Sequence, residues 1–477
     1  MRKNYIILFI LCICSAGLSA QTLEQAKAMF KNNEFAKAKP VFQRYVKSAP
    51  NNASYNHWYG VCLYETGDKQ EAEKYLLTGA KKKVQESYRY LAKLYSDLYR
   101  FDEAVENYEA YIELLEKKKQ PVEEYEKLLD IAKLSARMLK GVEDVAIIDS
   151  FVVDKKDFLK AYKISEESGK LFTYNEYFKT NGDNEGTVYL TELENKLFYG
   201  DKAGGEDLNI FTKNKMLDEW GKAGKLPDVV NVPGNENYPY VLSDGITIYY
   251  ASDGEGSMGG YDIFVTRYNT NTNSYMIPDN VGMPFNSPYN DYMFAIDEYN
   301  NLGWFASDRY QPEGKVCIYV FIPNSSKQTY DYESTDNDVI RHAAMIQSIK
   351  DTWKDKAAVQ AGKQRLTMAL YAKPKVKQVR DFEFVIDDIH TYYVFNDFNA
   401  PQAKVLFKQW QQKKKDLTKL SKQLDEMRDK YAQSNKSARA SMAPRILDTE
   451  KRVEQMEQEL NVLEKNVRNE EKKFLSK

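Results

Sequence analysis

The sequence predicts a multidomain α + β chain with an α-solenoid, a β-propeller of about six blades and a C-terminal antiparallel coiled-coil hairpin. Three observations carry this prediction. Helix-forming residues repeat at a spacing of 34 near the N-terminus, strand–turn–strand units recur at about 50 residues in the middle, and apolar residues recur every seven towards the C-terminus. A chain of 477 residues has room for this division, because one domain commonly holds about 150 residues.

The N-terminal helical part is expected over residues 21–140. The string at residues 33–38 recurs at 67–72 and again at 99–104, and each copy ends in an Ala where two helices would pack. These copies resemble the tetratricopeptide repeat, which places small residues at the crossing of its two helices. A further helix at residues 121–139 would cap the stack, and the alternative is a generic helical bundle.

The middle part is expected to be a β-propeller over residues 141–400. The segment 240–253 matches 292–308, and both consist of a strand, an Asp-containing turn and an aromatic second strand. These units resemble the blades of TolB-type propellers, which belong to the wider class of WD40-like propellers. Three more hairpins of this kind are expected, at residues 164–174, 189–201 and 384–397.

Two other segments belong to the predicted propeller. The strand-like residues 145–149 could pair with the last blade and close the ring. Residues 338–371 carry an apolar stripe at helical spacing, which predicts a helical insertion that packs on the propeller.

Residues 401–477 predict the coiled-coil hairpin, with a polar loop at residues 434–441 between its two arms. Such a hairpin offers a route to oligomerisation. The first arm has its heptad residues at Trp410, Leu417, Leu420, Leu424, Met427 and Tyr431. The second arm has them at Ile446, Val453, Met456, Leu460, Leu463, Val467 and Phe474.

The first twenty residues are expected to form a secretory signal peptide. Two basic residues precede an apolar stretch of about ten residues, and small residues lead up to Gln21. Cleavage after Ala20 would export the chain, whereas the alternative of a membrane anchor needs a longer apolar run. Cys62 and Cys317 remain after cleavage, and since they fall in different predicted domains we expect two buried free thiols.

The composition argues against several classes of function. The chain has 68 Lys and Arg against 70 Asp and Glu, and this near-balance argues against a dedicated nucleic-acid-binding protein. Its three His and four Cys form no HExxH motif and no Cys/His cluster, so no metal or other cofactor is expected. Beyond the signal peptide no apolar run reaches the roughly 18 residues of a membrane helix.

Two polar loops could carry chemistry, and each has a plainer interpretation. Residues 181–192, from Asn181 to Glu192, place oxygen-bearing side chains at the spacing of a calcium loop, but their flanks are strand-like and favour an inter-strand turn. Residues 253–262 are glycine-rich and lack the Gly-Lys-Ser/Thr of a phosphate-binding loop, so a tight rim loop that touches a partner is the functional alternative.

No catalytic residues are predicted. Asp201, Asp253 and Asp308 recur at matching positions, which favours capping of turns, since a catalytic group is needed once. Neither His342 nor His390 neighbours a Ser or Cys nucleophile in the sequence. A propeller enzyme that acts on a glycan or peptide stays open as an alternative, as does a calcium or small-ligand binding module.

Candidate partner-binding residues come from the repeat register. The first helix of each pair lines the concave face of a solenoid, and this register is expected to expose His57, Val61, Tyr64, Arg89 and Lys93. A mixed aromatic and basic lining suits a peptide of acidic character. Ordinary solvated helix faces are the alternative.

Tetratricopeptide repeats followed by TolB-type blades in an exported chain resemble a family of Bacteroidetes envelope proteins. Some relatives belong to the type IX secretion machinery and carry an OmpA-like peptidoglycan-binding domain, which a coiled-coil hairpin replaces here. The resemblance implies a non-catalytic scaffold or adaptor in the periplasm, associated with the outer membrane, whose partners are other envelope proteins. The resemblance does not imply that this chain binds peptidoglycan, and it assigns no catalytic residue to it.

Overall fold

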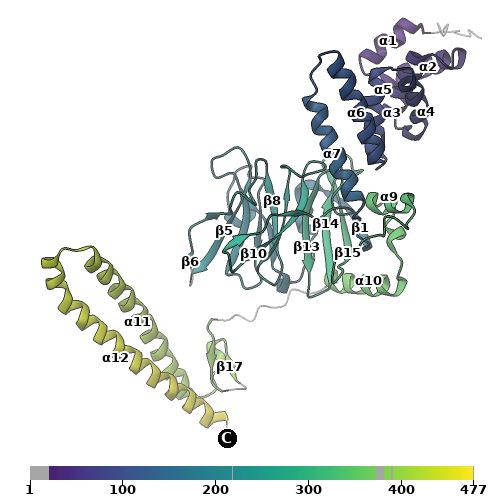
Figure 1. Ribbon diagram of the computed structural model, residues 1–477. Coiled ribbons are helices and arrows are strands. Elements are labelled where there is room, and N and C mark those ends of the chain that lie inside the picture. The colour runs from purple at the N-terminus through teal and green to yellow at the C-terminus, as the bar shows by residue number, and fades with distance from the viewer. Residues whose placement is uncertain (1–20, 217–218, 372–380, 388–389, 476–477) are drawn as a thin grey trace, which may run out of the picture. The chain divides into compact units, whose positions relative to one another are not determined.

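The computed structural model describes residues 21–216, 219–371, 381–387 and 390–475 (Figure 1). The expected signal peptide therefore lies outside the described residues. The chain divides into two compact units, residues 1–372 and 373–477. The expected division at residue 400 differs, because the segment just before it belongs to the second unit.

The N-terminal part of the first unit consists of paired helices, as the repeat spacing predicts. At one helix crossing a Cβ on Gly60 would lie 2.9 Å from Cγ of Leu76, so a small residue is required there. The pairs α1/α2, α3/α4 and α5/α6 are followed by α7. Their bounds are Leu23–Lys31, Phe35–Ser48, Ala53–Glu65, Lys69–Lys81, Gln85–Asp97, Phe101–Lys117 and Glu123–Leu139 for α1 to α7.

Equivalent turns within the helix pairs require a left-handed backbone. Asn33, Gly67 and Tyr99 occupy this position with φ values of 60°, 92° and 55°. Asn and Gly adopt this conformation readily, whereas a bulky aromatic residue is strained there. The Tyr99 ring is 1% exposed and packs in a cluster with residues of the sheets, so burial at this contact offsets the strain.

The first sheet follows the order β2–β3–β4–β5, and the short strands β6 and β7 both pair with β5. The bounds of its four main strands are Lys170–Thr173, Thr187–Leu190, Lys196–Asp201 and Asn209–Met216, and β6 and β7 are Glu219–Trp220 and Gly224–Lys225. The second sheet contains β8 (Glu236–Val241), β9 (Thr247–Ser252), β10 (Asp262–Asn269), β11 (Ser274–Tyr275) and β12 (Asp279–Asn280).

The third sheet follows the order β1–β15–β14–β13. Its strands are β13 (Asp291–Asp297), β14 (Leu302–Ser307), β15 (Lys315–Ile322) and β1 (Ala146–Asp154). The strand-like segment therefore pairs with a late sheet, but its partner is β15 of the third sheet and not the hairpin at 384–397, which was the last expected blade.

The described residues form three large sheets, whereas about six blades were expected. The expected hairpin at 164–174 is not a separate blade, because only β2 is a strand and it pairs with β3 of the next hairpin. The expected hairpin at 384–397 gives only the two-residue strands β16 (Phe384–Val385) and β17 (Thr391–Tyr392) in the second unit. A strand–turn–strand pattern in the sequence therefore does not by itself identify a blade.

The three sheets share one apolar core, and tyrosine hydroxyls connect neighbouring sheets within it. Tyr189 of the first sheet donates to the carbonyl oxygen of Val241 at 2.9 Å, and Tyr240 of the second donates to that of Ile296 at 2.6 Å. These bonds satisfy phenol groups that would otherwise be costly to bury.

The helical insertion packs on the sheets, as its apolar stripe predicts. It consists of α9 (Asn337–Met345), a 3-10 segment (Ile349–Thr352) and α10 (Lys356–Tyr371), which lies beside the third sheet (Figure 1). Thr352 Oγ1 accepts from the backbone N–H of Ile147 at 3.0 Å, and Trp353 Nε1 donates to its carbonyl oxygen at 2.7 Å. These bonds cover the outer edge of β1, which would otherwise be open to another strand.

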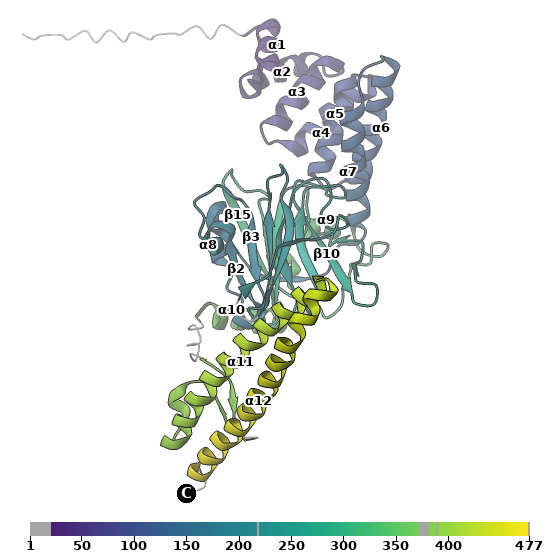
Figure 2. The same cartoon turned by 90° about the vertical axis from the view of Figure 1, so that its left-hand side faces the viewer.

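The second unit is an antiparallel helical hairpin on an aromatic base. Its helices α11 (Pro401–Gln433) and α12 (Lys436–Leu475) lie side by side (Figure 2), and the loop between them is shorter than predicted. Trp410, Leu424, Ile446 and Val467 are buried in the predicted seam, but Phe474 is 49% exposed.

A buried carboxylate holds the start of α11. Glu471 of α12 is fully buried and accepts hydrogen bonds from the backbone N–H groups of Asn399 and Ala400, at 2.7 and 3.0 Å. Because the N-terminus of a helix has unpaired N–H groups and a positive dipole, this carboxylate caps α11 from its partner helix.

Candidate protein-binding surface

Three of the predicted groove residues are not exposed. His57, Val61 and Tyr64 are 6%, 0% and 9% exposed, so the expectation that the repeat register exposes them is wrong. Rings from the neighbouring helices cover this face of α3, because Phe30 and Tyr90 lie 6.3 and 6.2 Å from the His57 ring.

The His57 side chain is held inside the repeats, where it has a hydrogen-bond partner. Its Nδ1 lies 3.0 Å from Oγ of Ser87, and burial lowers the pKa of the imidazole to about 4. The ring is therefore neutral at physiological pH and cannot supply positive charge to a ligand.

Arg89 and Lys93 keep part of their surface, as predicted. The Lys93 ammonium lies 5.4 Å from the Tyr64 ring and 5.8 Å from the Tyr90 ring, and no ion pair to it occurs within the described residues. Arg89 Nε donates to Glu86 at 2.7 Å, and its guanidinium lies 4.6 Å from the Tyr90 ring. The two cations thus lie over an aromatic surface, and Lys93 is the one without an acidic partner.

A hollow of about 470 Å³ lies beside these residues between α3, α5 and α6. Tyr111 donates to Glu86 at 2.9 Å in its wall. This hollow was not predicted from the sequence, because its residues come from three helices and no short motif joins them. Its other lining residues include Ser54, Trp58, Gln85, Leu115 and Lys118.

The recurring aspartates cap turns, as predicted. Asp253 accepts from both the backbone N–H and the side-chain amide of Asn235, at 2.6 and 2.9 Å. Asp308 accepts from the same two groups of Asn290, both at 2.9 Å. Asp201 accepts from the side-chain amide of an equivalent residue, Asn184, at 3.1 Å.

Two further asparagines each clamp a strand of the sheet that precedes them in the chain, β5 in the first sheet and β10 in the second. Asn231 Oδ1 accepts from the N–H of Ile210 at 2.7 Å, and its Nδ2 donates to the carbonyl of the same residue. Asn286 makes the same pair of bonds to Ile263. These residues were not predicted from the sequence, although their spacing of 55 equals the repeat of the sheets.

Buried acids lie at the first residue of β8 and β13. Asp291 Oδ1 accepts from the guanidinium of Arg309 at 2.7 Å, and both side chains are fully buried. Glu236 Oε1 accepts from Ser252 at 2.8 Å, whereas its Oε2 is buried without a hydrogen-bond partner in the described chain. Burial raises the pKa of Glu236 to about 8.

Part of the glycine-rich loop at 253–262 packs against the helical repeats of the same chain. Met258 is 2% exposed and packs in one cluster with Tyr99 and Phe101. The alternative that this loop touches a partner is therefore wrong for Met258. Its side chain is buried in the contact between the repeats and the second sheet.

The loop from Asn181 to Glu192 does not have the shape of a calcium loop. Its residues 187–190 form β3, so Glu192 lies beyond a strand of four residues, which spans about 13 Å. In the described part of the chain no three His, Cys, Asp or Glu side chains are placed to hold a metal. His390 Nδ1 lies 2.9 Å from Asp387 within one turn.

The two cysteines that follow the expected cleavage site are free and buried, as predicted. Among the described residues no helix is both long and apolar enough to cross a membrane.

Comparison with known protein families gives a match to one segment of the chain. The tetratricopeptide repeat family matches residues 23–85, which contain α1 to α4. No curated protein shows significant similarity to the chain. Repeats of this family present extended surfaces to other proteins, so the match indicates protein–protein interaction.

Proposed function

We propose that this protein is a non-catalytic scaffold that binds other proteins through its helical repeats and the sheets that follow them. The observation that carries the proposal is the tetratricopeptide match at residues 23–85, together with the part-exposed cations Arg89 and Lys93 on the aromatic surface of α3 and α5. Aromatic residues and arginine are the side chains most often found at the centre of protein interfaces.

The polar residues that recur in the sheets support a role without catalysis. Asp253 and Asp308 each receive two hydrogen bonds from an asparagine, and Asp291 is paired with Arg309. Carboxyl groups engaged in this way hold turns and strands, and they are not free to exchange protons with a substrate.

For its location, we propose export to the periplasm, association with the outer membrane and a role in envelope assembly or secretion. The basic and apolar pattern of the first twenty residues and the order of repeats and sheets support this proposal. Mass spectrometry of the N-terminus in the envelope fraction tests it. A mature chain that begins at Gln21 is expected, and an intact Met1 would contradict export.

The binding role is tested by crosslinking capture with the double variant Arg89→Glu/Lys93→Glu. One partner should be lost and others retained, because the hairpin and the sheets offer separate surfaces. Lys47→Glu, at an exposed residue of α2, is the matched control and should retain all partners. Loss of every partner, or of none, by the double variant would contradict binding at this surface.

A further inference from the structure

The first strand of the first sheet has one edge to which no strand is paired. This strand, β2, forms a ladder with β3 on its other edge. The backbone N–H of Tyr174, the residue after β2, donates to the carbonyl oxygen of Gly186 at 2.8 Å in the same ladder. Since successive residues of a strand point their backbone groups to opposite edges, Leu171 and Thr173 turn theirs away from β3.

The outward-facing backbone groups of β2 have no hydrogen-bond partner within the described part of the chain. They are the N–H and the carbonyl oxygen of Leu171 and the N–H of Thr173. Every residue of β2 also keeps part of its surface exposed. The edge is therefore both unpaired and accessible.

Other strand edges are covered by groups of the same chain. The helical insertion covers the outer edge of β1. On β8 the carbonyl oxygen of Val241 accepts from the Tyr189 hydroxyl at 2.9 Å. On β13 that of Met293 accepts from the Tyr162 hydroxyl at 2.6 Å. Because an unpaired strand edge is a template for another strand, the contrast marks β2 as the edge that is open to a partner.

A hollow of about 400 Å³ runs along this edge, between β2 and the 3-10 segment Lys155–Ala161. Its apolar side chains are those of Leu159, Ile164 and Leu171, which pack against the common core of the sheets, together with Phe172. Leu171 and Phe172 point to opposite faces of the sheet because they are consecutive in a strand. An aliphatic side chain opposite Leu171 would therefore enter the apolar part of the hollow.

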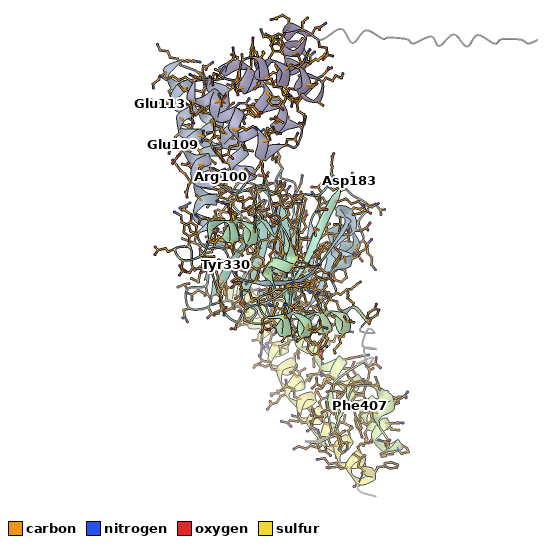
Figure 3. The ribbon with its side chains drawn as sticks, turned by 90° about the vertical axis from the view of Figure 1, so that its right-hand side faces the viewer. Arg100, Glu109, Glu113, Asp183, Tyr330 and Phe407 are labelled. Carbon is orange, nitrogen blue, oxygen red and sulfur yellow. The ribbon has the colours of Figure 1, made fainter. Side chains whose placement is uncertain are left out.

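The edge runs between the two ends of the sheets. Figure 2 shows β2 at the side of the sheets, next to α8 (Tyr174–Phe178). Figure 3 shows Asp183, in the loop from α8 to β3, on the end of the sheets that faces the repeats. Since β3 starts from this loop and β2 is antiparallel to it, a segment bound along β2 has one end directed towards the repeats.

The charges around the hollow favour neither an acidic nor a basic occupant. Lys160 pairs with Asp157 at 2.7 Å. Lys170 pairs with Glu194 at 2.9 Å. The hollow is lined by three lysines and three acids, which are Lys156, Lys160, Lys170, Asp157, Glu166 and Glu176. An occupant without charge matches this balance.

We propose that β2 binds an extended, uncharged segment of a partner protein as an added antiparallel strand. The residue opposite Leu171 exchanges two backbone hydrogen bonds with it, and its aliphatic side chain packs beside Leu159 and Ile164. This inference rests on the proposed function and deepens it, because it assigns one strand edge and the kind of segment that the edge takes.

Fluorescence anisotropy on the full mature chain tests the inference with defined peptides. The probe is a fluorescein-labelled peptide in which Val and Thr alternate, with Gly and Ser at both ends. One counterpart is N-methylated at its Val residues, which removes the N–H groups directed at β2. The other is N-methylated at its Thr residues, whose N–H groups point away. We expect saturable binding of the probe and of the Thr-methylated peptide, and about tenfold weaker binding of the Val-methylated peptide.

Two variants at Thr173 locate the site. Its φ of −73° is close to the angle that proline requires, so Thr173→Pro removes an outward N–H with little backbone strain. Thr173→Ala is the matched control, because both variants lose the hydroxyl that accepts from the N–H of Glu176 and only the proline loses the N–H. Thr173→Pro should weaken binding about tenfold, and Thr173→Ala should bind as the wild type does. Thermal unfolding of both variants checks that the fold is retained.

Four results would overturn the inference. Absence of saturable binding, or equal binding of the two methylated peptides, would show that the ligand does not pair with a strand edge. Equal weakening by the two Thr173 variants would assign the effect to the lost hydroxyl. A concentration-dependent dimer in sedimentation that Thr173→Pro abolishes would assign the edge to a second copy of the chain. The proposed scaffold fails separately, through the crosslinking capture with the variant at Arg89 and Lys93.

Discussion

The second and third sheets have similar polar frameworks. Asn231 and Asn286 precede these two sheets and each clamp a strand of the sheet before, at Ile210 of β5 and Ile263 of β10, and Asp253 and Asp308 cap the equivalent turn. The residue after the capping aspartate is Gly254 in the second sheet but Arg309 in the third.

This difference changes the state of the buried acid. Arg309 forms an ion pair with Asp291 and donates to the carbonyl oxygens of Pro284 and Phe285, both at 2.8 Å. Burial raises the pKa of Asp291 to about 6, and Arg309 opposes this rise. Glu236 forms no ion pair among the described residues, and burial raises its pKa to about 8.

The comparison shows how one repeat can serve two purposes. In the second sheet Met258 of the glycine-rich loop packs in one cluster with Tyr99 and Phe101 of the repeats. In the third sheet the buried Arg309 fixes the loop, and the next residue, Tyr310, stays exposed. The framework residues hold the strands and turns, while the loop residues decide whether an end of the sheet packs internally or stays exposed.

The largest expected effect is the loss of the buried ion pair. Arg309→Met should lower the free energy of unfolding by about 3–5 kcal/mol, because it leaves Asp291 and two carbonyl groups buried without their partner. Urea denaturation measures this loss. Lys315→Met, which removes an exposed pair with Asp154, should cost less than about 1 kcal/mol; equal losses would contradict the contrast.

The asparagine clamps should matter equally in the first and second sheets, whose strands β5 and β10 they hold. Asn231→Ala and Asn286→Ala should each lower the free energy of unfolding by about 2 kcal/mol, since each leaves a backbone N–H and C=O of a buried strand unpaired. A loss confined to one of the two variants would show that the sheets do not share this framework.

The unpaired acid should produce a smaller, pH-dependent effect. Folded Glu236 keeps its proton up to about pH 8, whereas a Glu in the unfolded chain loses it at much lower pH, so wild-type stability falls as pH rises through this window. Relative to the wild type, Glu236→Gln should gain about 1 kcal/mol in unfolding free energy between pH 6 and pH 7. A difference independent of pH would mean that Glu236 is ionised in the fold.

The smallest effect is expected from removal of the second unit. A chain that ends at residue 372 should keep the thermal transition of the sheets within experimental error, because the aromatic base at Phe384, Phe398 and Phe407 belongs to the hairpin. An insoluble or molten truncated chain would show that the sheets depend on this unit.

The sequence predicted the features that depend on local spacing. The helix pairs followed from small residues 34 apart, the sheet turns from recurring aspartates, and the hairpin from heptads. The covered groove was not predictable, because Phe30 and Tyr90 reach His57 from other helices. The blade count failed since β2 completes a neighbouring sheet, and the role of Met258 depends on a contact across the fold.

The central claim is that the third sheet, and not the equivalent part of the second, presents a side chain to a protein partner. The direct measurement is photo-crosslinking in cell extract with p-benzoylphenylalanine placed at Tyr310, or at the equivalent exposed residue Glu255. The account predicts a discrete protein adduct at position 310 and none at position 255. Equal labelling at both positions, or an adduct at 255 alone, would contradict it.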